Sequence, residues 1–197
     1  MNRTLVTTGL AALLALTAAC SSTVPTGTKD VERAGATVLV YRGPEVEAAL
    51  GYRFASANLG SDWLMIDLAA TATTKTVEVK RERISLRTPD GATVPLATQQ
   101  EFGEAYGSLR ADIERANVAA DPLDYFPRTR IPCEFAFFTE PGEGLAYPSV
   151  WLDDRRVCYG RLFFAVPGGV QEGTYTLAID LEESQLRIPF KLGGEER

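Results

Sequence analysis

Residues 157–166 read Val-Cys-Tyr-Gly-Arg-Leu-Phe-Phe-Ala-Val, and this stretch gives the clearest indication of the fold. Its β-branched and aromatic content and the turn residues on both sides predict one long strand. Alternate residues of a strand point to the same face, so Cys158, Leu162 and Phe164 share the face that we expect to lie in the core.

Similar strands are expected along most of the chain. In residues 63–72, Leu64, Ile66, Leu68 and Ala70 form the expected core face, and in residues 131–138 that face carries Ile131, Cys133, Phe135 and Phe137. The other expected strands are residues 37–41, 51–56, 75–86, 94–96, 149–152, 174–179 and 185–190, with a bend near Arg81 where the apolar phase changes. These short strands, separated by turn signals, predict an all-β fold, an antiparallel sandwich of two sheets.

One stretch has a helical period instead. Thr98 and Glu101 have the spacing of a capping box, and an apolar stripe follows at intervals of three and four residues. The stripe consists of Phe102, Tyr106, Leu109, Ile113 and Ala116. It predicts one α-helix inserted in the β fold at about residues 98–118, with the stripe packed on the core.

Residues 121–132 contain three prolines and suit no regular element. The stretch is either a strap over one end of the core, with Tyr125 and Phe126 tucked under it, or a rim that contacts a ligand or partner. In the second case Tyr125, Phe126, Arg128 and Arg130 are the candidate contact residues.

The sequence from Tyr159 to Pro167, followed by Gly173-Thr-Tyr-Thr-Leu177, resembles the end of the telokin-like immunoglobulin domains of bacterial lipoproteins. In that family a hydrophobic strand ending in Val-Pro precedes a strand that contains tyrosine. The resemblance implies an immunoglobulin-like β-sandwich, a role in adhesion, scaffolding or protein contact, and no catalytic residues. The helix and strap at 98–130 depart from the family as an insertion.

The amino terminus has the organisation of an export signal. Arg3 gives a positive start, residues 5–19 are apolar or small, and Ala18 and Ala19 precede Cys20. This segment resembles bacterial lipoprotein precursors, although Thr17 stands where leucine is commoner. The resemblance implies lipidation of Cys20 and, since Ser21 follows, anchoring in the outer membrane, facing the periplasm or the cell surface. Plain secretion and an uncleaved anchor are the alternatives.

The expected organisation is therefore a signal peptide at 1–19, a lipidated cysteine and flexible tether at 20–35, and a single β-sandwich domain at 36–197. Loss of the signal peptide removes Arg3, so that 19 basic and 26 acidic residues leave a charge of −7. A chain this acidic is not expected to bind nucleic acid. The expected partners are the lipid membrane, through acylated Cys20, and an unidentified envelope protein or polymer.

The chain contains no histidine, which excludes Ser-His-Asp and Cys-His catalysis and histidine-ligated zinc. Lipidation of Cys20 would leave Cys133 and Cys158, which an oxidising compartment would join in a disulfide; two buried free thiols are the alternative. No metal site or cofactor is expected.

The remaining catalytic candidates are three pairs of neighbouring carboxylates: Asp153/Asp154, Glu182/Glu183 and Glu140/Glu143. Neighbours on a strand point to opposite sides, so solvated turn charges are the simpler interpretation.

We expect a non-enzymatic, membrane-anchored module for protein interaction or structure. The first alternative is a lipoprotein that binds a glycan or small ligand through Trp63, Trp151, Tyr125 or Phe126. The second is a hydrolase that uses carboxylates. A flat apolar patch would favour the interaction module. An exposed aromatic shelf would favour the ligand-binding protein, and a deep pocket with two carboxyl groups would favour the hydrolase.

Overall fold

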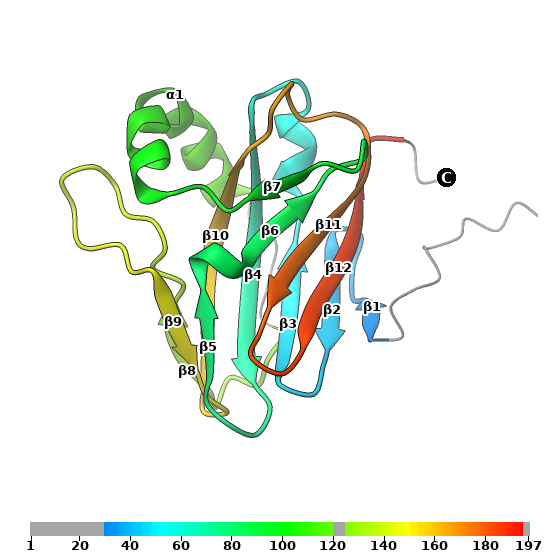
Figure 1. The fold of residues 1–197 in the computed structure, drawn as a ribbon, viewed down its shortest axis with the longest axis vertical. Coiled ribbons are helices and arrows are strands. Elements are labelled where there is room, and N and C mark those ends of the chain that lie inside the picture. The colour runs from blue at the N-terminus through cyan, green and yellow to red at the C-terminus, as the bar shows by residue number, and fades with distance from the viewer. Residues whose placement is uncertain (1–29, 120–124, 195–197) are drawn as a thin grey trace, which may run out of the picture.

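The computed structural model describes residues 30–119 and 125–194 (Figure 1). The elements are β1 (Val31–Arg33), β2 (Val38–Arg42), β3 (Val46–Gly51), η1 (Phe54–Asn58), β4 (Trp63–Ala72), β5 (Val77–Lys80), η2 (Arg81–Arg83), β6 (Ile84–Arg87), β7 (Thr93–Pro95), α1 (Gln99–Val118), β8 (Ile131–Glu134), β9 (Ser149–Leu152), β10 (Arg156–Ala165), β11 (Gly173–Asp180) and β12 (Gln185–Leu192).

Two sheets stack face to face, as Figure 1 shows, and this confirms the predicted all-β sandwich with one helix. The larger sheet has the strand order β1-β2-β3-β4-β10-β8, and the smaller has the order β12-β11-β6-β7. Strands β5 and β9 form a separate two-stranded sheet. All pairs are antiparallel except β8 with β10, which is parallel and lies at the edge of the larger sheet.

The main core lies between the two sheets. The predicted core face of β4 is correct: Leu64, Ile66 and Leu68 are buried in one cluster with Leu86 of β6 and Leu177 of β11. The opposite face of β4 is also buried, because α1 and residue Phe126 cover it. Apolar residues on both faces explain why β4 reads as an almost unbroken hydrophobic run.

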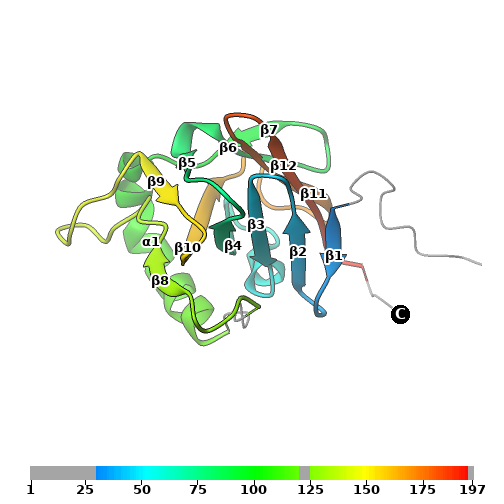
Figure 2. The ribbon, with the colours of Figure 1, turned by 90° about the horizontal axis from the view of Figure 1, so that it is seen from below.

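Helix α1 lies on the outer face of the larger sheet, away from the smaller sheet (Figure 2). The predicted capping box is present, with the Thr98 hydroxyl accepting from the Glu101 amide and the Glu101 carboxylate accepting from the Thr98 amide. Phe102 and Leu109 of the predicted stripe pack on Met65 of β4 and Phe163 of β10. The helix therefore adds a second apolar layer outside the sandwich.

Two predicted strands differ from the structure. The strand expected at 51–56 is the 3₁₀ turn η1, preceded by β3, whose residues 46–51 pair with both β2 and β4. Strand β8 ends at Glu134, and Ile131, expected in the core, is 60% exposed because β8 is an edge strand. The bend expected near Arg81 is present as the 3₁₀ turn η2 between β5 and β6.

Strand β1 lies inside the stretch predicted to be tether, because Val31–Arg33 pair with β2 and extend the larger sheet. The predicted signal peptide, Cys20 and the rest of the predicted tether up to residue 29 lie outside the described residues. No helix within 30–119 or 125–194 is long and apolar enough to cross a membrane.

Candidate binding groove

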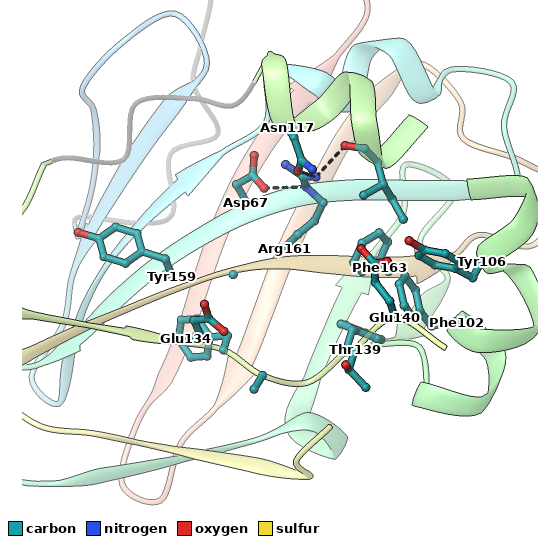
Figure 3. Close-up of a pocket in the computed structure, with 15 residues that line it drawn as sticks. Asp67, Phe102, Tyr106, Asn117, Glu134, Thr139, Glu140, Tyr159, Arg161 and Phe163 are labelled. Atoms are coloured by element: carbon teal, nitrogen blue, oxygen red, sulfur yellow. Dashed lines mark hydrogen bonds and ion pairs between the residues drawn. The ribbon is translucent and has the colours of Figure 1, made fainter. Parts of the chain in front are cut away.

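A groove of about 640 Å³ separates α1 from the segment 134–140, with the outer face of β10 as its floor (Figure 3). It is lined by Asp67, Phe102, Tyr106, Ile113, Asn117, Glu134, Phe135, Ala136, Phe138, Thr139, Glu140, Tyr159, Gly160, Arg161 and Phe163.

Aromatic rings form one end of the groove. The rings of Phe102, Phe138 and Phe163 contact one another pairwise, with centroids 4.7 to 5.2 Å apart. Tyr106, one turn along α1, packs edge-on against Phe102 at 5.6 Å. Three separate segments contribute these rings, so mutual packing fixes the width of the groove at this end.

A polar cluster forms the other end. Arg161 of β10 and Asp67 of β4 are cross-strand partners, and Arg161 Nε donates to Asp67 Oδ1 over 2.8 Å. Arg161 Nη1 also donates to Asn117 Oδ1 at 2.9 Å, near the end of α1. Both members of the ion pair are mostly buried, with side-chain exposures of 13% and 17%. The guanidinium therefore ties the helix to the sheet.

Two further carboxylates line the groove, and both belong to the segment 134–140. The Glu140 carboxylate lies beside the Tyr106 hydroxyl and raises the pKa of that tyrosine through a hydrogen bond, with burial adding to the effect. Neither Glu134 nor Glu140 forms an ion pair with any residue in the described ranges.

The wall formed by 134–140 is held by β10. The sulfur atoms of Cys133 and Cys158 lie 1.97 Å apart, at disulfide distance, and the two residues are register partners in β8 and β10. The Phe135 amide donates to the Tyr159 carbonyl at 2.8 Å. A Cβ at Gly160 would lie 2.7 Å from Phe135 Cβ, so only glycine allows the wall to approach so closely.

The predicted contact residues of the strap do not form one surface. Phe126 is 4% exposed and packs on Val40, Ala69 and Val157, which makes it unsuitable as a contact residue. Tyr125 is 39% exposed and lies 5.5 Å from the Arg42 guanidinium, which also donates to its hydroxyl.

Neither arginine of the predicted rim lies in the groove. Arg130 donates to the Thr71 hydroxyl and Arg128 is exposed. Of the two residues that the strap interpretation places under the strap, Phe126 is buried and Tyr125 is exposed. Residues 121–124 lie outside the described residues.

The other candidates are also separated. Trp151 on β9 is 54% exposed, whereas Trp63 packs against the α1 cluster. Of the three predicted carboxylate pairs, only Glu140 lines the groove. Burial raises the pKa of the Asp153 carboxyl, but hydrogen bonds from Arg155 and Arg156 outweigh burial and the net pKa is lowered. Asp153 therefore stabilises a turn.

Sequence reasoning missed the groove, although one signal was available. Asp67 and Arg161 are charged residues in the middle of two otherwise apolar strands, and such residues are costly to bury unless they are paired. One acidic and one basic residue placed in this way could have suggested an ion pair between the two strands, covered by the predicted helix.

Comparison of the chain with protein-family models, with curated proteins and with solved structures returns no match. Within residues 30–119 and 125–194, no group of three or more acidic or cysteine side chains is placed to hold a metal ion.

Proposed function

We propose that this chain is a lipid-anchored protein of the cell envelope whose folded domain is a non-enzymatic binding module, with its ligand in the groove between α1 and β10. The observation that carries the proposal is the groove itself. Its volume of about 640 Å³ lies in the usual range for small-molecule sites. Its aromatic end and its polar end together offer apolar contact and a few fixed polar groups, which is the usual composition of such sites.

The chemistry of the groove favours binding over hydrolysis. The Asp67 carboxylate is already engaged in an ion pair with Arg161. A carboxylate mechanism needs two carboxyl groups on opposite sides of a cleft, whereas Glu134 and Glu140 both belong to the wall 134–140.

The anchor is proposed on separate grounds. The resemblance of residues 1–21 to lipoprotein precursors supports lipidation of Cys20, and Ser21 after it supports sorting to the outer membrane, facing the periplasm or the surface. The resemblance of residues 159–177 to telokin-like domains supports an immunoglobulin-like module of the kind carried by such lipoproteins.

A second candidate function is contact with an envelope protein, which three exposed apolar side chains favour. Leu145, Tyr147 and Trp151 are each more than half exposed, and they lie on β9 and the loop before it. Several exposed apolar side chains within one short stretch of chain are a feature of protein contact sites when they form a patch.

Two experiments test the proposal. The full chain purified from its own envelope should carry a bound small molecule in native mass spectrometry, and this species should be lost in Ala136→Trp, which fills the groove. A wild-type protein that is always ligand-free would contradict binding. Palmitate labelling should mark the wild type and not Cys20→Ala; equal labelling of both would contradict the anchor.

The second candidate has its own test. Crosslinking through a photoreactive residue at Trp151 should capture an envelope protein, and the same residue at Arg110 on α1 serves as control. Equal capture from both positions would contradict a specific contact at β9.

A further inference from the structure

The groove carries an excess of negative charge. Its lining includes three carboxylates and one guanidinium, a net formal charge of −2. The guanidinium of Arg161 is compensated by Asp67 at 2.8 Å and is tied to Asn117. The uncompensated charges are therefore Glu134 and Glu140, both on the segment 134–140.

Aromatic side chains line the same space; Phe102 and Phe163 are buried, while Phe138 and Tyr106 are partly exposed. Phe102, Phe138 and Phe163 meet at one end of the groove, and Glu140 lies next to this cluster beside Tyr106 (Figure 3). Aromatic faces attract cations through the negative potential of the ring, and this attraction grows where water is displaced. Carboxylates beside aromatic rings therefore select for one sign of charge.

We propose that the ligand of this groove is a small organic cation with an apolar body, an amine or quaternary ammonium whose charge lies near Glu140 and whose apolar part contacts the phenylalanine cluster. This inference rests on the proposed function, because it names the chemical class of the ligand for the same site. The net charge of −6 of the whole chain also favours the approach of a cation.

An anionic ligand fits the groove less well. Arg161 is the only cation among the lining residues, and a carboxylate that approached it would also approach Asp67. Such a ligand would in addition approach the carboxylates of Glu134 and Glu140, and like charges repel.

The test uses three probes of similar size and different charge: phenethylammonium, 2-phenylethanol and 3-phenylpropionate. Each is titrated into the full chain at one ionic strength, and binding is followed by the amide chemical shifts of Gly160, Arg161 and Phe163, which report the groove. We expect phenethylammonium to bind about fivefold more tightly than 2-phenylethanol, and 3-phenylpropionate to bind most weakly.

Two variants assign the preference to the carboxylates. The double variant Glu134→Gln/Glu140→Gln keeps the size of both side chains and an acceptor for the Tyr106 hydroxyl, so thermal unfolding should change little. The advantage of phenethylammonium over 2-phenylethanol should disappear in it. Glu143→Gln is the matched control, because Glu143 is exposed, lies on the same loop and does not line the groove; it should retain the advantage.

The outcomes separate this inference from the proposed function. Equal affinities, or tightest binding of 3-phenylpropionate, overturn the cation preference but leave a binding groove, since the shifts still lie within it. If phenethylammonium still binds more tightly than 2-phenylethanol in the double variant, the assignment of the cation preference to Glu134 and Glu140 is also overturned. If no probe changes the amide chemical shifts of the groove residues, the inference is overturned. Native mass spectrometry of the wild type and Ala136→Trp then decides whether the groove binds any ligand.

Discussion

Arg161 Nε lies 2.8 Å from Asp67 Oδ1, and the two residues are direct register partners in the neighbouring strands β10 and β4. This ion pair lies under α1 at the polar end of the groove and is mostly buried. The pair links two strands and, through Asn117, the helix.

Loss of one partner should leave a buried charge uncompensated. Arg161→Met is expected to lower the free energy of unfolding by about 3 kcal/mol. This is near the lower end of the losses seen when one partner of a buried ion pair is removed, because both side chains retain some exposure. Urea denaturation measures the change. Arg187→Met is the matched control: its pair with Asp180 is more exposed, so the cost should be below about 1 kcal/mol. Equal losses in both variants would contradict the argument.

The capping box should contribute to the stability of α1. Thr98→Ala removes the hydroxyl that accepts from the Glu101 amide, with an expected loss of about 1 kcal/mol. Ser108→Ala lies on the same helix at an exposed position and should be neutral or slightly stabilising, since alanine has the higher helix propensity. Chemical denaturation of both variants provides the test, and a neutral Thr98→Ala would show that the cap is dispensable.

The capping box also predicts that the stability of the fold depends on pH. Hydrogen bonds from the amide and hydroxyl of Thr98 lower the pKa of Glu101 in the folded state below its ordinary value of 4.5. A lowered folded pKa contributes stability above the unfolded pKa, and this contribution is lost as the pH falls through the folded value. Between about pH 6 and pH 3, the wild type should therefore lose more stability than Glu101→Gln. Parallel pH curves for the two proteins would contradict the prediction.

Two glycines should respond to alanine in opposite directions. Gly160→Ala places a Cβ 2.7 Å from Phe135 Cβ and should cost about 1–3 kcal/mol while displacing the groove wall. Gly103→Ala lies in the interior of α1 with no atom within 4 Å of the added Cβ, and should stabilise by about 0.5–1 kcal/mol. Thermal unfolding of both variants measures the signs, and the same sign for both would contradict the close approach at Gly160.

The pairing of Cys133 with Cys158 closes a loop between positions 25 residues apart. Reduction should lower the free energy of unfolding by about 3–4 kcal/mol and should loosen the groove wall that follows Cys133. Intact mass with and without reductant, followed by denaturation of both forms, provides the measurement. A mass unchanged by reductant would show that the thiols are free.

Local patterns in the sequence were enough to predict most elements. The limits of β4 were predicted to the residue because an apolar run with one charge follows the turn residues 58–62. Helix α1 was predicted because its cap and its apolar stripe lie within 20 residues of each other. The 3₁₀ turn at 54–58 was missed because Tyr52 and Phe54 have high strand propensity, and tertiary packing overrode it.

The sequence by itself determined that the chain forms many short strands and one capped helix, because periods of 2 and 3.6 residues depend only on neighbours along the chain. The tertiary structure alone decided that β4 lies next to β10, that α1 covers the outer face of that pair, and that Phe126 points inward while Tyr125 does not. These relationships join residues far apart in the sequence, such as Asp67 and Arg161. They depend on which packing buries apolar surface and pairs charges such as these two, and no local pattern carries that information.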